Sequence, residues 1–242
     1  LSLGGLKPVV AIYSTFLQRG YDQFIHDVCL ENLDVTFAID RAGIVGEDGP
    51  THTGSFDISF MRCIPNIVIA CPSNEHELWH LLDICYEYKG PTAIRYPRGS
   101  GIGIKPMPNE NQGFKIGKAK KIKDGQSVCI LNFGVLIDLI NKIAEKRNYT
   151  LYDMRFIKPI DEDALNHAMQ HDTIITLEDN TLLGGCGSAI GEKLHQQKFK
   201  GDFLSIGLKD EFPAHGSRDE ILRQNGLDKE NIKKTIDDFL KN

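Results

Sequence analysis

The sequence predicts an α/β protein made of two tandem α/β domains with mainly parallel sheets. Short runs of β-branched residues alternate with amphipathic segments, which is typical of parallel strands joined by crossover helices. The chain has 242 residues, 41% hydrophobic and 25% charged, which is the composition of a globular protein and enough length for one or two compact units.

The first half of the chain contains four expected strands and two expected helices. The strands cover residues 8–14, 35–40, 66–71 and 91–97. A helix beginning at Phe16 has an apolar stripe at helical spacing, formed by Leu17, Tyr21, Phe24, Ile25 and Val28. A second helix has Ser73 or Asn74 as its N-cap, and its stripe contains Leu78, Leu81, Leu82 and Cys85.

The chain opens with "LSLGGLKPVVAIYS", which suggests the last turn of a helix closed by Gly4 and Gly5 and then a strand. It has no initiator Met, so we expect that the beginning of a longer protein is missing.

Residues 99–115 are rich in Gly, Pro and Asn and lack periodicity, which predicts a linker. The expected division is a first domain over residues 1–100, a linker over 101–115 and a second domain over 116–242. In the second domain the expected strands are 127–134, 149–157, 173–179 and 202–208. The expected helices are 136–147, 162–169, 187–197, 218–225 and 229–240.

Charge and hydropathy exclude two classes of partner. The net charge is -5 and the only basic run is the short segment 118–123, so we expect no nucleic-acid partner. No apolar stretch approaches the roughly 20 residues of a membrane span, and no signal peptide is evident, so we expect no membrane partner. These features predict a cytoplasmic protein or a processed organellar one. The six cysteines lack C-x-x-C spacing and lie mostly in apolar segments, which predicts buried reduced thiols.

Polar side chains follow the expected strands of the first domain, where chemistry collects in open parallel sheets. Arg41 follows the second strand, the loop "GEDGPTHTG" with His52 comes next, and Arg98 follows the fourth strand. Guanidinium groups bind phosphate and carboxylate oxygens bidentately, and imidazole exchanges protons near neutral pH. This edge therefore suits a small phosphorylated or carboxylated substrate. The other polar residues placed there are Tyr13, Ser14, Asp40 and Arg95.

The same residues have structural alternatives, which spacing alone leaves open. His52 could be a hydrogen-bonded turn residue, and either arginine could form a surface or interdomain salt bridge. His76 and His80, four residues apart on a helix, are expected to form a solvated face rather than a zinc site. The Gly-rich turn in "DNTLLGGCGSAI" is expected to serve helix–sheet packing rather than anion binding, because no basic residue accompanies it.

Several quoted segments carry a family resemblance. "YSTFLQRGYDQFIHDV", "FAIDRAGIVGEDGPTHTGSFD", "RCIPN" and "AIRYPRG", in that order, closely resemble the 1-deoxy-D-xylulose-5-phosphate synthase family. "LYDMRFIKPID", "TLEDNTLLGGCGS" and "IGLKDEF" are similar to that family's last domain. The resemblance runs over essentially the whole chain. It covers only the family's second and third domains, a transketolase-like pyrimidine-binding domain and a transketolase C-terminal domain.

The resemblance implies a homodimeric transferase that uses thiamine diphosphate and Mg²⁺. Such an enzyme decarboxylates pyruvate and transfers the two-carbon unit to D-glyceraldehyde 3-phosphate, and the product feeds isoprenoid, thiamine and pyridoxal phosphate synthesis.

Carried over residue by residue, the resemblance also implies roles for individual side chains. Phe16 would stack on the cofactor's aminopyrimidine, with Tyr13 and Arg19 on the same wall. His52 would handle protons, with Asp48 nearby in its loop. The two residues expected to hold the acceptor phosphate are Arg41 and Arg98.

The family's first domain, which carries the magnesium and diphosphate site, has no counterpart here, and the glutamate that tautomerises the aminopyrimidine is expected upstream of Leu1. The chain by itself is therefore expected to be inactive, to contact that missing domain, and to hold no metal. The alternatives are a transketolase, a thiamine-dependent dehydrogenase β subunit, or a module without catalysis.

Overall fold

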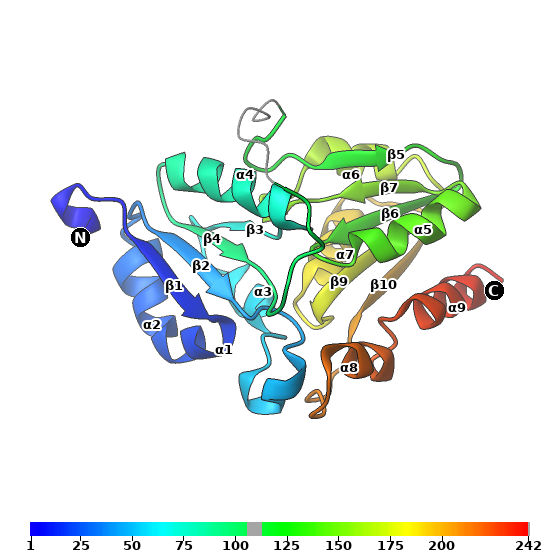
Figure 1. Ribbon diagram of the computed structural model, residues 1–242. Coiled ribbons are helices and arrows are strands. Elements are labelled where there is room, and N and C mark those ends of the chain that lie inside the picture. Colours follow the sequence, from blue (N-terminus) through cyan, green and yellow to red (C-terminus); the bar gives the residue numbers. More distant parts are fainter. Residues whose placement is uncertain (106–112, 242) are drawn as a thin grey trace.

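The computed structural model describes residues 1–105 and 113–241 and contains two sheets that lie side by side (Figure 1). The expected fold class, two α/β units with mainly parallel sheets, is confirmed. The first sheet has the spatial order β1 (Val9–Tyr13), β2 (Thr36–Asp40), β4 (Thr92–Arg95), β3 (Val68–Ala70) and β8 (Phe156–Lys158). The second has the order β10 (Asp202–Leu208), β9 (Thr173–Thr181), β6 (Val128–Phe133), β7 (Thr150–Asp153) and β5 (Lys120–Lys123). Within the described residues, only β8 and β5 pair antiparallel.

Helical segments connect the strands. The longer ones are α4 (Glu75–Glu87), α5 (Ile137–Arg147), α6 (Glu162–Ala168), α7 (Cys186–Gln196), α8 (Arg218–Gln224) and α9 (Lys229–Phe239). The shorter ones are η1 (Ser2–Gly4), α1 (Ser14–Leu17), η2 (Gln18–Gly20), α2 (Tyr21–Gln23), η3 (Phe24–Cys29), η4 (Gly46–Asp48), η5 (Pro50–His52) and α3 (Asp57–Met61). In Figure 1, α1 and α2 lie on one side of the first sheet and α4 on the other. None of the described helices is both long and apolar enough to cross a membrane.

Most of these elements were predicted from local sequence patterns. The predicted N-cap of α4 is confirmed, because the Asn74 side chain accepts a hydrogen bond of 3.0 Å from the Glu77 amide. The apolar stripe of α4 is correct for Leu81 and Cys85, which are buried, and wrong for Leu82, which is 37% exposed. The prediction for His80 is also wrong. This side chain is buried and its ring stacks on Phe114 at 4.6 Å, so it belongs to the interior.

The segment 149–157, predicted as one strand, is two strands in different sheets. Arg155 has a φ of 57°, which turns the chain between β7 and β8. Its guanidinium binds the buried Glu77 carboxylate of α4, with an Nε to Oε2 distance of 2.7 Å, and Ser73 donates a hydrogen bond of 2.6 Å to Asp153. These long-range contacts hold the turn, and β8 therefore completes the first sheet from the second half of the chain.

The strand β5 was not predicted, because its lysine-rich sequence resembles a solvated charge run. Lysines are common on exposed edge strands, where they discourage pairing with other chains. The predicted linker 101–115 lies partly outside the described residues. In its described part, the Gly103 amide donates a hydrogen bond of 2.7 Å to Glu75.

The two halves share an apolar core. One buried cluster contains Leu17 and Phe24 of the first half together with Leu131 and Ile190 of the second. Burial of such side chains is the main favourable term in folding, so the halves stabilise each other. Five of the six cysteines are buried and all six are free thiols, as predicted, whereas Cys63 is exposed.

Candidate active site

The carboxyl ends of β1, β2 and β4 meet at one edge of the first sheet. The strands are parallel, and Tyr13 at the end of β1 lies opposite Asp40 at the end of β2. Arg41 follows β2 directly and Arg98 follows β4. The sheet therefore brings together side chains that are far apart in the sequence, at the edge where open α/β sheets carry their sites.

The loop that carries His52 is closed at its base by two glycines. Gly43 and Gly54 form an antiparallel bridge with N to O distances of 2.8 and 2.9 Å. A Cβ on Gly54 would lie 2.1 Å from the carbonyl oxygen of Arg41, so only glycine permits this approach. Between the two glycines the chain makes the turns η4 and η5, and His52 is the last residue of η5.

The second half of the chain packs against this loop. Gly46, the first residue of η4, has a φ of 71°, and a Cβ there would lie 2.6 Å from the backbone nitrogen of Arg218. Arg218 is the first residue of α8, so η4 packs against the start of that helix. The position of the histidine loop therefore depends on both halves.

An aromatic group lies beside the histidine. The rings of Tyr13 and Phe16 stack at 4.9 Å with an interplanar angle of 17°, and the His52 ring meets Phe16 edge-on at 5.7 Å. Phe16 is 48% exposed, which is unusual for a phenylalanine that already has two ring contacts. The stacked rings therefore expose an aromatic surface to solvent beside the imidazole of His52.

The imidazole of His52 is oriented by its own loop. Its Nδ1 lies 3.0 Å from the hydroxyl oxygen of Thr51. The Thr15 hydroxyl donates a hydrogen bond of 3.1 Å to the Thr51 carbonyl, which ties this turn to α1 and hence to Phe16. Loop and helix therefore hold the histidine and the phenylalanine in one arrangement.

The two expected phosphate-binding arginines converge on one carboxylate. The Arg41 guanidinium contacts the Asp48 carboxylate and also lies over the Tyr13 ring, with 4.3 Å between the guanidinium carbon and the ring centroid. The Nε of Arg98 lies 3.5 Å from the same Asp48 oxygen, and another Arg98 nitrogen lies 3.6 Å from Glu47. The structure thus joins Tyr13, Arg41, Asp48 and Arg98, and places Asp48 beside the arginines.

Arg19 is exposed in η2, one turn after Phe16, and lies outside this set of contacts among the described residues. Arg95, which the sequence places at the same sheet edge, is buried instead. It forms ion pairs with Asp57 at 3.0 Å and Asp179 at 2.6 Å. Burial lowers the pKa of Arg95, but the Asp179 and Asp57 carboxylates outweigh this and raise it. Burial likewise raises the pKa of Asp57, which Arg95 partly offsets. Arg95 therefore joins the two halves.

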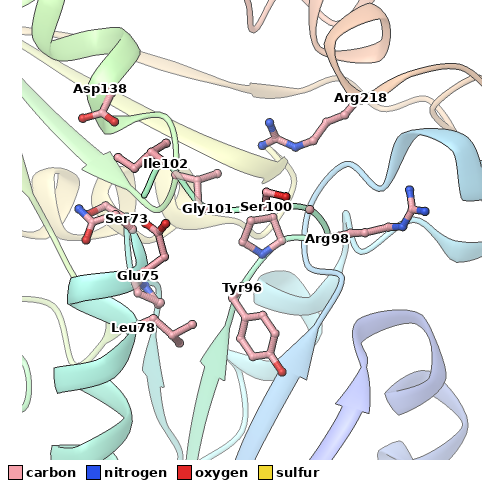
Figure 2. Close-up of a pocket in the computed structure, with 15 residues that line it drawn as sticks. Ser73, Glu75, Leu78, Tyr96, Arg98, Ser100, Gly101, Ile102, Asp138 and Arg218 are labelled. Carbon is pink, nitrogen blue, oxygen red and sulfur yellow. The ribbon is translucent and has the colours of Figure 1, made fainter. Parts of the chain in front are cut away.

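A cavity of about 440 Å³ lies between the two halves next to Arg98 (Figure 2). The start of α4, the segment after β4 and the start of α8 line it. Its charged residues are Glu75, Arg98, Asp138 and Arg218. In Figure 2 the Arg98 side chain extends away from the middle of the cavity, which agrees with its contacts to Glu47 and Asp48.

The Gly-rich turn before α7 is occupied by a side chain of the protein itself. The buried Glu178 carboxylate accepts hydrogen bonds of 2.8 and 2.7 Å from the amides of Cys186 and Gly187. Burial raises the pKa of Glu178 to about 7, although these amides lower it in part. The turn therefore serves helix–sheet packing, as expected. Within the described ranges, no group of three or more His, Cys, Asp or Glu residues is arranged to hold a metal ion.

Two features of the site were missed at the level of sequence. One is the link from Asp48 to both arginines, for which the only signal is an acidic pair directly before the turn at Gly49. The other is the support of the loop by Arg218, which is 172 positions away from Gly46 (218 − 46) and gives no local signal.

Comparison with known proteins agrees with this architecture. Residues 1–101 match the family described as transketolase, pyrimidine binding domain, and residues 117–232 match transketolase, C-terminal domain. A protein titled split gene transketolase, inactive beta4 tetramer, has the same fold with a TM-score of 0.84 and 23% identity, covering 98% of this chain and 77% of that one. A transketolase from Campylobacter jejuni gives a TM-score of 0.73 at 17% identity, covering 96% of this chain and 35% of that one.

Fold and domain matches define a transketolase-type α/β protein. Curated relatives identify the family within this class. The 1-deoxy-D-xylulose-5-phosphate synthase of Idiomarina loihiensis is 52% identical over 242 residues, which is 100% of this chain and 39% of the relative. The synthase of Francisella philomiragia is 51% identical over 243 residues, 99% of this chain and 39% of the relative. The chain belongs to the 1-deoxy-D-xylulose-5-phosphate synthase family and spans about two fifths of the length of these relatives.

Proposed function

We propose that this chain forms part of a thiamine-diphosphate-dependent transferase that condenses pyruvate, with loss of CO₂, and D-glyceraldehyde 3-phosphate to 1-deoxy-D-xylulose 5-phosphate. The observation that carries the proposal is the placement of an exposed aromatic ring, an imidazole and two guanidinium groups at one sheet edge. The residues concerned are Phe16, His52, Arg41 and Arg98. The synthase names of the relatives support the choice of reaction.

The residues beside Phe16 fit a flat heteroaromatic ring. The Phe16 ring is 48% exposed, and the Ser14 hydroxyl at the start of the same helix is buried without a hydrogen-bond partner among the described residues. Thiamine diphosphate, when bound, supplies the electron sink for the carbon–carbon bond changes. Phe16, with Tyr13 behind it and Arg19 one turn further on, would contact the aminopyrimidine.

His52 would exchange protons with the substrates. Its Nδ1 lies 3.0 Å from the Thr51 hydroxyl oxygen, so Nε2 would be the nitrogen that reaches a substrate oxygen. A positioned imidazole contributes about 10²- to 10⁴-fold to rate by general acid–base catalysis. Arg41 and Arg98 would hold the phosphate of the aldehyde and thereby orient its carbonyl, since remote binding energy positions the reacting atom. Asp48 lies in the same loop as His52, and we propose that it is also a catalytic residue.

The rest of the synthase would have to come from outside these 242 residues. The diphosphate and Mg²⁺ ligands, and the glutamate that acts on the aminopyrimidine, are proposed to lie in the part of the relatives that this chain does not match. We therefore propose that the chain alone is inactive, that it works as a cytoplasmic homodimer in contact with that part, and that the product enters isoprenoid synthesis.

An activity assay tests the proposal. The chain would be incubated with pyruvate, D-glyceraldehyde 3-phosphate, thiamine diphosphate and Mg²⁺, alone and with the non-matching part of a relative made as a separate polypeptide. Deoxyxylulose phosphate formed only with both pieces supports the proposal. Consumption of a ketose phosphate donor would instead favour a transketolase, and transfer to lipoamide a dehydrogenase β subunit. No product from two folded, associated pieces would favour a module without catalysis.

A further inference from the structure

One carboxylate oxygen lies between the two arginines that are proposed to bind phosphate. Asp48 Oδ2 contacts a terminal nitrogen of Arg41 and lies 3.5 Å from Nε of Arg98. The side chains of Arg41 and Asp48 are only 22% and 21% exposed, so the contact is partly withdrawn from solvent. The neighbouring Glu47 is 72% exposed and reaches only Arg98, at 3.6 Å. An oxygen shared by two guanidinium groups has the position that a phosphate oxygen would take.

The two arginines extend from the ends of neighbouring strands, whereas Asp48 lies in a turn. Arg41 follows β2, its backbone amide donates a hydrogen bond of 2.7 Å to Asp40, and its guanidinium lies over the Tyr13 ring. Arg98 follows β4, the neighbour of β2 in the sheet. Asp48 belongs to a short turn that ends at Gly49, whose φ is 72°. The sheet therefore sets the positions from which the two arginines extend, and the turn delivers the acid to them.

We propose that Asp48 is an internal counterion, which occupies the arginine pair until the phosphate of a substrate displaces it. This inference rests on the proposed function, because it assumes that the arginines bind the acceptor phosphate. Without an anion, two adjacent guanidinium groups repel each other, and Asp48 removes that repulsion. A phosphate monoester dianion competes well with one carboxylate, whereas a neutral acceptor or a monoanionic carboxylate such as pyruvate competes poorly. Asp48 thus lowers the apparent affinity of the pair for every anion by the same factor, so that only an anion with high intrinsic affinity, such as a phosphate dianion, fills it at low concentration.

Binding of inorganic phosphate and of pyruvate to the 242-residue chain tests this role. The chemical shift of Arg98 Nε–Hε, followed by ¹⁵N NMR, reports occupancy of the pair directly. In Asp48→Asn we expect phosphate and pyruvate each to bind about tenfold more tightly, because the internal competitor has lost its charge and both ligands gain by the same factor. The resonance should also shift in the ligand-free variant. In the matched control Glu47→Gln we expect less than a twofold change.

The outcomes separate the inference from the proposed function. Equal tightening in both variants would mean that Asp48 contributes only a general negative field, and weaker phosphate binding in Asp48→Asn would make it part of the binding site. Either result overturns the inference alone. If phosphate binds neither the original chain nor any variant, and Arg41→Gln changes nothing, the arginine pair is not a phosphate site and both proposals fail. Asp48→Ala serves as the second variant if Asp48→Asn does not fold.

Discussion

The His52 ring lies between a hydroxyl on one side and an aromatic ring on the other, and in the proposed function its Nε2 is the nitrogen that would reach a substrate. Thr51 faces Nδ1 and Phe16 meets the ring at 5.7 Å. Whether this imidazole is catalytic, as proposed, is decided by its effect on turnover.

Replacing His52 with alanine should lower kcat/KM for deoxyxylulose phosphate formation by about 10²- to 10⁴-fold in the complemented enzyme. The thermal midpoint should change little, because the side chain is not fully buried. The matched control is His26→Ala, which removes an exposed histidine paired with Asp22 and should leave activity unchanged. An active His52→Ala enzyme would assign the loop a structural role.

Arg95 joins the two halves through buried ion pairs with Asp57 and Asp179. Methionine at this position should lower the free energy of unfolding by about 3–5 kcal/mol, because it leaves two buried carboxylates without their cation. Chemical denaturation measures this. Lys193→Met, which breaks the exposed pair with Glu162, should cost about 1 kcal/mol or less. Similar decreases in the free energy of unfolding in both variants would show that the buried ion pairs of Arg95 stabilise the protein no more than an exposed pair does.

At the scale of elements, the histidine loop depends on a glycine that no local pattern singles out. Gly46 combines a left-handed backbone with close approach to the start of α8. Alanine at Gly46 should destabilise the protein by about 1–3 kcal/mol more than alanine at Gly226, which has a similar φ of 75° but open space around it. Thermal or denaturant unfolding of the two variants measures the difference. Equal decreases in the free energy of unfolding would mean that α8 can move away from the added methyl group without an energetic cost.

An element can be predicted from the sequence when the residues that determine it are close together in the chain. The N-cap at Asn74 and the loop around His52 follow from local chemistry, so the sequence shows them. The break between β7 and β8 depends on Arg155 binding Glu77, which lies 78 positions away. The burial of Arg95 depends on Asp179, 84 positions away. Pairings of this kind leave no mark on the periodicity, and this is why Arg95 appeared to be a site residue and 149–157 a single strand.

At the scale of the whole molecule, two buried carboxylic acids make stability depend on pH: Asp153 at the end of β7 and Glu178 in β9. Burial and the nearby Glu77 raise the pKa of Asp153 to about 7, although Ser73 lowers it in part, and burial also raises that of Glu178 to about 7. In the unfolded chain both acids titrate near pH 4. The folded protein therefore holds their protons more tightly, and this contribution to stability is complete below about pH 4 and disappears as the pH rises through 7.

The free energy of unfolding should therefore fall by about 2.5 kcal/mol for each of the two acids, roughly 5 kcal/mol in all, between pH 5 and pH 7.5. Asp153→Asn should about halve this dependence, since the amide cannot ionise and still accepts the Ser73 hydrogen bond, while Glu178 still titrates. Urea unfolding at a series of pH values measures it. In Asp124→Asn the slope should remain, because Asp124 is exposed and its pKa is lowered by the Lys121 hydrogen bond. A slope unchanged in Asp153→Asn would show that Asp153 is ionised throughout.

A chimera can show whether these residues form a synthase active site. In the Idiomarina loihiensis synthase, the 242 matched residues would be replaced by this chain, and deoxyxylulose phosphate formation from pyruvate and D-glyceraldehyde 3-phosphate would be measured. We predict an active chimera that loses activity on His52→Ala and shows a raised KM for the phosphorylated aldehyde on Arg98→Gln. A folded chimera that binds thiamine diphosphate but forms no product, or keeps full activity in both variants, would contradict this account.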